Sequence, residues 1–332
     1  MRSEQKPVRD TSFAFADAQI RAMESQLLTQ THLQQLISAP DVRSATDLLT
    51  GWGVITGEKG ISAQAQLQQS LCRTWESVHA LVPDQPAMTL PLIKNDCHNL
   101  KTALKALVCD RDPEPFFLYP NTVDPAALYQ CIKEKRFDQI PASKDFAGFA
   151  EEAYELVTRV MDAQLLDCQI DRYALEQILK AGKESGSELF FRYACFMADT
   201  ALIKIAYRAA RAKKSKQFIT DALIDTPNLS AALLGSAAAK GCEELLNTLG
   251  ATPYAQGAAL LRTAPAAFEK WCDDEAMEIL SEARQISFGI EPLLAYYTAR
   301  ETELNNVRMI LACKASGADE QTVTERMRQL YV

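Results

Sequence analysis

Apolar residues recur at helical spacing along the chain. The first clear stretch runs from Phe13 to Leu28, with Ile20 on the same helical face as Phe13. Asp41 and Asp47 each stand where a carboxylate could accept a hydrogen bond from the first turn of a helix, so we expect short helices to begin there. The pattern predicts an all-α fold.

Composition strengthens this prediction. Ala, Leu, Gln, Glu, Lys and Arg, which lose least on entering a helix, are frequent, whereas only 13 glycines occur. Apolar residues make up 48% and charged residues 23%, the balance of a chain that folds around a packed core. At 332 residues the chain can form two or three units of ordinary domain size.

Two breaks in composition suggest boundaries between such units. One is the proline-rich stretch from Arg111 to Pro125, and the other is the basic, apolar-poor stretch from Arg211 to Gln217. They divide the chain into nearly equal thirds, which we expect to be three helical repeat units covering residues 1–112, 113–215 and 216–332.

A short pattern recurs once in each third. It consists of an acidic residue, an aliphatic residue four positions later and a basic residue one position after that, and the three copies lie 103 and 104 residues apart. Even spacing of this kind favours a triplicated unit. The acids are Asp96, Asp199 and Glu303, the bases are Lys101, Lys204 and Arg308, and the position three after the acid holds Asn99, Leu202 and Asn306.

Helical geometry assigns structural roles to this pattern. Positions one, four and eight after the acid, which are Cys97, Leu100 and Leu104 in the first copy, form one stripe that we expect to face the core. The acid and the base are separated by about 140° around the helix, so they should contact different neighbouring helices and not each other. The alternative is that these are ordinary surface charges on amphipathic helices.

Motifs for catalysis or metal binding are weak. The nine cysteines are scattered and never form C-x-x-C, and the three histidines lack the spacing of metal ligands, so we expect reduced thiols and no zinc site. The stretch from Gly53 to Gly60 has the wrong spacing for a phosphate-binding loop and is interpreted as a flexible turn. We therefore expect no catalytic residue, no metal and no cofactor.

One acidic cluster keeps an enzymatic alternative open. Asp273, Asp274, Glu275 and Glu278 loosely resemble the acidic motif that holds Mg²⁺ in all-helical terpenoid synthases. Met277 occupies the place of the last acid of that motif, and no second cluster can be aligned with it. An exposed acidic helix face is the simpler interpretation.

Charge and hydropathy limit the partners. The net charge of −8 disfavours nucleic acid and anionic lipid, although a local basic patch is formed by Arg211, Lys213, Lys214 and Lys216. The opening segment from Met1 to Thr11 is polar, and no run approaches the roughly 18 apolar residues needed to span a bilayer. We expect a cytoplasmic protein that reaches a membrane only through a protein partner, without direct insertion.

The third copy of the pattern lies in a recognisable sequence. The stretch from Glu291 to Leu311, E-P-L-L-A-Y-Y-T-A-R-E-T-E-L-N-N-V-R-M-I-L, resembles the C-terminal signature of the V/A-type rotary ATPase family whose members are known as C in prokaryotes and d in eukaryotes. The resemblance continues to Val332, returns at D-C-H-N-L-K from Asp96 and is visible from Phe13 to Leu28. Leu202, where the family usually carries Asn, and the stretch 57–91 depart from it.

The resemblance implies both a fold and a role. Members of this family form a funnel of three related helical subdomains around a pseudo-threefold axis. They accept the tip of the central axle in the funnel mouth and rest on the membrane proteolipid ring, so that they transmit torque for proton or sodium transport and carry out no chemistry. Two alternatives are an unrelated all-helical adaptor, for which repeats of about 30 to 50 residues would be typical, and a Mg²⁺-dependent helical enzyme using Asp273.

Overall fold

The computed structural model describes residues 13–82, 85–160 and 162–332. Every regular element in these ranges is a helix, which confirms the predicted all-α fold. The polar opening segment on which part of the localisation prediction depends lies outside the described residues. In the part of the chain that the structure describes, no helix is both long enough and apolar enough to cross a membrane.

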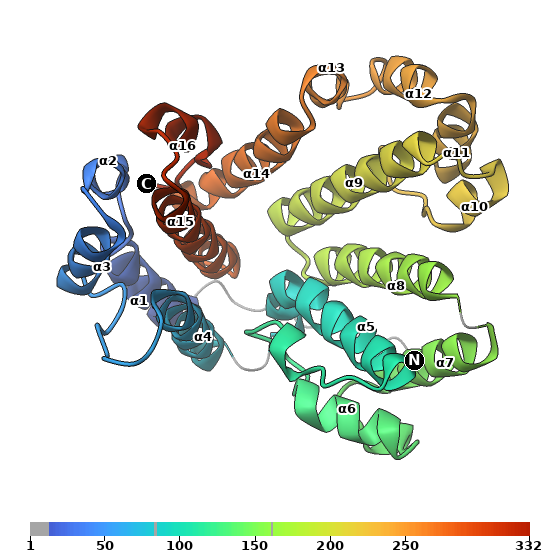
Figure 1. Ribbon diagram of the computed structural model, residues 1–332, viewed down its shortest axis with the longest axis horizontal. Helices are drawn as coiled ribbons and strands as arrows, with labels where there is room; N and C mark the ends of the chain where they lie inside the picture. The colour runs from blue at the N-terminus through green and yellow to red at the C-terminus, as the bar shows by residue number, and fades with distance from the viewer. Residues whose placement is uncertain (1–12, 83–84, 161) are drawn as a thin grey trace. The chain divides into compact units, whose positions relative to one another are not determined.

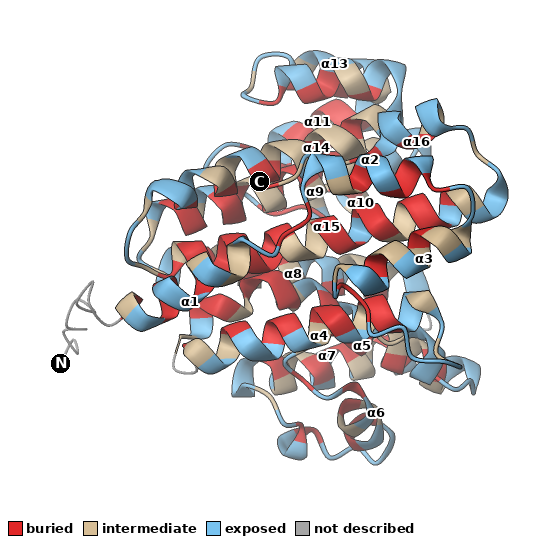
Figure 2. Ribbon diagram, turned by 90° about the vertical axis from the view of Figure 1, so that its left-hand side faces the viewer, coloured by how far each residue is buried: buried red, intermediate tan, exposed pale blue. Residues whose placement is uncertain are grey.

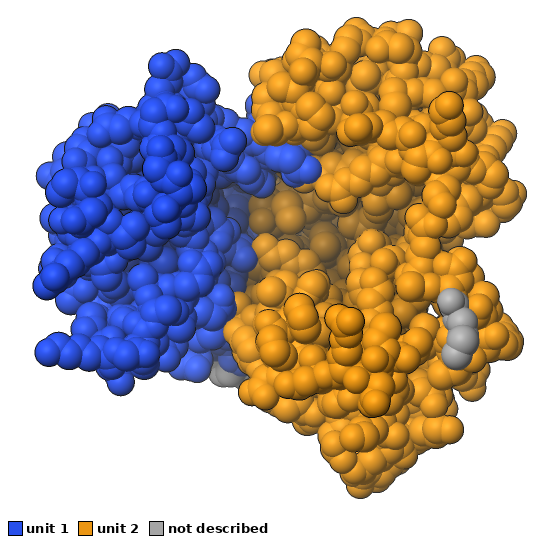
Figure 3. Space-filling view, in the orientation of Figure 1, with its two compact units in different colours: residues 1–88, 269–332 blue, residues 89–268 orange. Residues whose placement is uncertain are grey.

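The chain folds into two compact units, one of which is discontinuous in sequence (Figure 3). Unit 1 combines residues 1–88 with residues 269–332, and unit 2 is the continuous segment 89–268. The 3₁₀ helix η2 (Pro86–Leu92) and α14 (Pro265–Ser281) contain the points where the chain passes between units. The expected repeat units 1–112, 113–215 and 216–332 remain a prediction.

Unit 1 is organised around α15 (Glu291–Ser316), its longest helix at 26 residues. Four helices from the beginning of the chain pack against α15, and its face toward them is buried (Figures 1 and 2). The other elements of the unit are α1 (Ala14–Glu24), α2 (Gln30–Ser38), α3 (Val42–Gly51), α4 (Ala63–Leu81), the greater part of α14, η5 (Glu282–Gln285) and α16 (Glu320–Arg326).

Unit 2 is built around α8 (Ala163–Glu184), which packs between α5 (Ile93–Cys109) and α9 (Glu188–Arg211) (Figure 1). Further helices complete unit 2, and some of them pack against α5 or α9. They are η3 (Glu114–Phe116), α6 (Pro125–Lys133), η4 (Phe137–Gln139), α7 (Lys144–Val160), α10 (Lys216–Asp221), α11 (Ala231–Lys240), α12 (Cys242–Leu249) and α13 (Ala255–Thr263).

Local sequence explains several helix boundaries. The Asp41 side chain accepts a hydrogen bond from the Ser44 N–H at 2.7 Å and starts α3, as predicted. The prediction for Asp47 is wrong, because the cap at Asp41 fixes the start of a single helix that continues through Asp47 to bury Leu49. The first helix ends at Glu24, earlier than expected.

The predicted core stripe of the first pattern copy is confirmed. Cys97, Leu100 and Leu104 are all buried on α5, and the two leucines are fully enclosed. In α15 the equivalent residues Leu304 and Val307 are also fully buried. The three long helices that carry the pattern, α5, α9 and α15, are therefore core elements of their units.

Candidate functional site

The first copy of the pattern fastens a connecting segment to α5. The Asp96 carboxylate accepts hydrogen bonds from the backbone N–H groups of Thr122 at 2.9 Å and Val123 at 3.2 Å, and from the Thr122 hydroxyl. Burial raises the pKa of Asp96 despite these donors. Asp96 is only 6% exposed, and its carboxylate forms its hydrogen bonds with Thr122 and Val123 of the same chain.

Asn99, one turn along the same helix, holds the same segment at a second point. Its side-chain amide donates to the Leu118 carbonyl at 3.0 Å, and its side-chain oxygen accepts from the Leu118 N–H at 2.8 Å. Asn95 adds a hydrogen bond to the Pro120 carbonyl at 2.8 Å. The backbone of an irregular segment thereby gains the polar partners that a strand or a helix would otherwise give it.

The second copy uses its acid differently. Asp199 on α9 is completely buried and accepts from the hydroxyl of Thr226, from the side-chain amide of Asn228 at 2.9 Å and from the hydroxyl of Tyr254. Burial and the neighbouring carboxylate raise the pKa of Tyr254. All three donors are side chains, so the carboxylate links two connecting segments, one before α11 and one before α13.

Leu202 explains why the second copy differs. This residue stands where the other copies have Asn, and it is fully buried as part of the core. A leucine side chain has no group that can form a hydrogen bond with the backbone. The segment after α10 is instead held by two carboxylates: Asp199 accepts from the Thr226 hydroxyl, and Asp225 accepts from the Ala231 N–H at 2.9 Å.

In the third copy, Glu303 on α15 lies beside the connection between α1 and α2. Its carboxylate accepts from the Leu28 N–H at 2.9 Å and forms an ion pair with Arg300 one turn earlier on α15. Glu303 is 1% exposed, and burial outweighs the attraction of Arg300, so that its pKa is raised to about 7.

Asn306 repeats the arrangement of Asn99. Its amide donates to the Arg328 carbonyl at 3.0 Å, and its oxygen accepts from the Arg328 N–H at 2.9 Å. Two copies of the pattern therefore use the same two-way pairing of an asparagine side chain with one backbone residue. Periodicity alone gives no signal for this pairing, because its backbone partner lies in an irregular segment.

The bases of the pattern contact elements other than those held by the acids. Lys101 forms ion pairs with Asp171 at 2.7 Å and Asp167 at 3.7 Å, both on α8. Arg308 donates to Gln68 on α4 at 3.1 Å, and burial lowers its pKa.

Lys204 also makes a polar or electrostatic interaction. The expectation that each acid would contact a neighbouring helix is wrong, since the partners of the acids are mainly connecting segments. That these eight residues, Asp96, Asn99, Lys101, Asp199, Lys204, Glu303, Asn306 and Arg308, act as structural supports remains a prediction.

The acidic cluster on α14 receives the last residues of the chain. Arg328 forms an ion pair with Asp273 at 2.7 Å, and the backbone N–H of Gln329 donates to Asp274 at 2.6 Å. The side chain of Gln329 donates to Glu278 at 3.0 Å. Among the described residues, no three His, Cys, Asp or Glu side chains are grouped so as to hold a metal ion.

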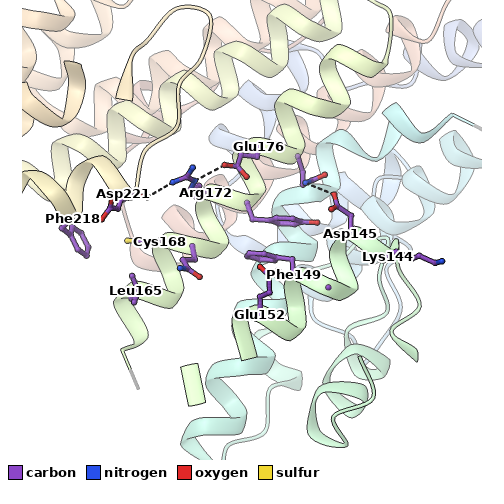
Figure 4. Close-up of a pocket in the computed structure, with 15 residues that line it drawn as sticks. Lys144, Asp145, Phe149, Glu152, Leu165, Cys168, Arg172, Glu176, Phe218 and Asp221 are labelled. Atoms are coloured by element: carbon purple, nitrogen blue, oxygen red, sulfur yellow. Dashed lines mark hydrogen bonds and ion pairs between the residues drawn. The ribbon is translucent and has the colours of Figure 1, made fainter. Parts of the chain in front are cut away.

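A surface pocket of about 800 Å³ lies between α7, α8 and α10 in unit 2 (Figure 4). The rings of Phe149 and Tyr173 stack in its wall with their centroids 3.9 Å apart. Arg172 pairs with Glu176 at 3.0 Å across one turn of α8. No pattern in the sequence pointed to this pocket, because its lining comes from helices whose individual patterns are ordinary amphipathic ones.

Comparison with known proteins assigns the chain to a family. The model of the ATP synthase (C/AC39) subunit family matches residues 16–326. The chain belongs to this family. The match covers nearly the whole chain and confirms the resemblance seen from Glu291 to Leu311.

Curated relatives agree over similar lengths. The C subunit of the V-type sodium ATPase of Enterococcus hirae is 21% identical over 322 residues, covering 94% of this chain and 97% of the relative. The C subunit of the A-type ATP synthase of Methanocaldococcus jannaschii is 22% identical over 355 residues, covering 96% of this chain and 86% of the relative. The corresponding protein of Methanobrevibacter smithii is 20% identical over 341 residues, covering 93% and 86%.

Proposed function

We propose that the chain is a non-catalytic central-stalk subunit of a V/A-type rotary ATPase or ATP synthase. In this role it connects the central axle of the soluble head to the proteolipid ring in the membrane, for proton or sodium transport. The family match over residues 16–326 carries the proposal. The curated relatives, which are named as C subunits of V-type and A-type complexes, support it.

The use of polar groups within the chain agrees with a mechanical role. The buried acids Asp96, Asp199 and Glu303 are engaged in hydrogen bonds to other parts of the same chain. Asp273 and Asp274, which raised the alternative of a Mg²⁺ site, bind the chain end. Helical units that are close-packed and tied by such bonds resist deformation, as a part that transmits torque requires.

The proposed partners are the axle subunits and the proteolipid ring. The axle would enter the mouth of a funnel with pseudo-threefold symmetry, and the ring would support its base. The chain would then be cytoplasmic and peripheral to the membrane, held there by the ring and without inserting into the bilayer itself.

Isolation of the intact complex tests this function. A tagged full-length chain purified from native membranes should bring down both axle and proteolipid subunits in constant ratio. Membranes that lack the chain should lose ATP-driven ion transport, and adding the purified chain should restore it. The proposal fails if neither partner is recovered, or if transport is unchanged without the chain.

Nucleotide binding provides an independent test. The purified chain should show no calorimetric signal with Mg-ATP at micromolar concentration, because the Gly53 to Gly60 stretch lacks the spacing of a phosphate-binding loop. Saturable binding of Mg-ATP at that concentration would contradict a purely mechanical role.

A further inference from the structure

The connection between α5 and α6, whose path is drawn in Figure 1, carries three exposed apolar side chains within four positions of the sequence. Phe116 is 60% exposed, Leu118 is 42% exposed and Tyr119 is 41% exposed. We call these three residues the 116–119 surface. Single exposed apolar residues are common on proteins, but three within four positions concentrate apolar surface in one short segment, which makes the segment a candidate interaction site.

The backbone beneath this surface is held firmly. His98, Asn99 and Asn95 of α5 each donate a hydrogen bond to a carbonyl of the segment, at 3.1, 3.0 and 2.8 Å. The carbonyls belong to Phe116, Leu118 and Pro120. Because the segment is already ordered, a partner that binds it would not have to supply the free energy of ordering a loop.

The third copy of the pattern shows that this pairing does not require exposed apolar residues. Asn306 holds Arg328 as Asn99 holds Leu118, yet the segment that follows Arg328 turns inward. Tyr331 there is 2% exposed, whereas Tyr119 is 41% exposed. The same pairing of an asparagine side chain with the backbone is therefore followed by a buried aromatic ring in unit 1 and by exposed apolar side chains in unit 2.

Charges next to the surface define what could bind it. Asp110, Asp112 and Glu114 precede Phe116 closely and are exposed, and Arg111 is the one base among them. Within the described ranges, none of these four side chains forms an ion pair. An anionic lipid surface would be repelled by the acids, and a second copy of this chain would bring the same acids face to face.

We propose that the 116–119 surface docks an amphipathic segment of another protein, whose apolar face is edged by Lys or Arg. The apolar face would cover Phe116, Leu118 and Tyr119, and the basic edge would meet Asp112 and Glu114. Opposite charges at the rim of such a contact mainly accelerate association and select the partner. The proposal stands independently of the coupling role, because it depends only on exposure, anchoring and charge.

Site-specific photo-crosslinking in cells that make the protein naturally tests the proposal. Benzoylphenylalanine would be placed at Phe116 in the full-length chain, and at Leu233 as a control. Leu233 is 54% exposed and lies on α11, away from the acids. We expect a protein adduct at position 116 with a yield about tenfold above that at position 233.

The crosslinked peptide must have apolar residues at helical spacing with Lys or Arg beside them. Replacing the acids in the double variant Asp112→Lys, Glu114→Lys should lower the yield about tenfold. Both positions are exposed, but the Asp112 carboxylate accepts a hydrogen bond from the Glu114 N–H at 3.1 Å, so the melting temperature of the double variant should fall by no more than about 5 °C. An unchanged helical circular dichroism spectrum at the crosslinking temperature excludes misfolding.

Several results would overturn the proposal. They are an adduct with lipid, with a second copy or with the chain itself, a crosslinked peptide that lacks basic residues, a yield no higher than at Leu233, and a yield insensitive to the charge reversal.

Discussion

The side chain of Asn306 pairs with the backbone of Arg328 in both directions, donating to its carbonyl and accepting from its N–H. The two residues are 22 positions apart, so the pair joins the middle of α15 to the chain end. Asn99 and Leu118 form the same pair across 19 positions. An asparagine at this position can therefore replace the backbone partner that an irregular segment lacks.

Asn99→Leu and Asn306→Leu should each lower the free energy of unfolding by about 1 to 3 kcal/mol. The first change leaves the Leu118 N–H without its partner, whereas the Leu118 carbonyl keeps a hydrogen bond from the Asn121 amide at 3.1 Å. The second change removes the partner of both the N–H and the carbonyl of Arg328. Hydrogen exchange should accelerate at the Leu118 amide in the first variant and at the Arg328 amide in the second. Asn247→Leu is the control, since exposed Asn247 only accepts one bond from Arg262, and it should change stability by less than about 0.5 kcal/mol. Equal effects at all three sites would contradict the pairing.

Glu303→Ala should destabilise the isolated chain by about 3 to 5 kcal/mol, because it leaves the Leu28 N–H without its acceptor and the largely buried Arg300 guanidinium without its counter-charge, with only the neutral Ser70 hydroxyl at 3.5 Å. Arg308→Ala should cost less, about 1 to 2 kcal/mol, since its bonds go to the neutral side chains of Gln68 and Asn305. Thermal melting of both variants checks this order.

Assembly provides the contrasting measurement for these two variants. If both melt like the parent chain yet fail to capture the axle or the ring, the residues belong to a partner-binding surface and not to the packing of unit 1.

The free energy of unfolding should depend on pH in a way that reflects the protonation of Glu303. Folding raises its pKa from 4.5 to about 7, so the folded chain binds this proton more tightly than the unfolded chain does. The resulting stabilisation is complete below pH 4.5 and is lost as pH rises to about 7. The free energy of unfolding of the parent chain, minus that of Glu303→Gln, should fall by up to about 3 kcal/mol across this range.

Denaturant titrations at several pH values measure that difference. Glu152→Gln, at an exposed position of α7, controls for the loss of one negative charge. A difference between the parent chain and Glu303→Gln that stays constant from pH 4.5 to 7 would mean that Arg300 keeps Glu303 ionised.

Lys101→Met should have a much smaller effect, less than about 1 kcal/mol. Its main partner Asp171 is 50% exposed, so solvent and salt screen the ion pair. Raising the salt concentration from about 0.05 M to about 0.5 M should reduce the difference further. A loss above about 2 kcal/mol would place Lys101 among the buried supports instead.

The helical fold and its core could be predicted because burial follows periodicity. Cys97, Leu100 and Leu104 fall on one stripe in sequence and are buried in the structure. The partners of the acids could not be predicted in this way. Asp199 meets Tyr254 across 55 positions, and irregular segments such as the one before α13 follow no period that would reveal which residue they bring close.

The acidic cluster on α14 shows the same limit. Its sequence predicts an exposed helix face, and Asp273 and Glu278 are indeed exposed. Local pattern could not reveal that Arg328 and Gln329 return to it across more than 50 positions. Periodicity thus indicated which positions are polar and which are buried. It could not indicate which distant residues form hydrogen bonds, because that depends on the path of the chain between them.

Unit 1 is assembled from the two ends of the chain, and this fixes the order in which a ribosome can complete the molecule. The segment 89–268 has all its residues once its last helix has left the exit tunnel, so unit 2 can fold during synthesis. Helices α1 to α4 must wait for α15, the helix they cover, to be translated. Until then their apolar faces need a chaperone or a transient contact, and a stalled or truncated product would leave them unprotected.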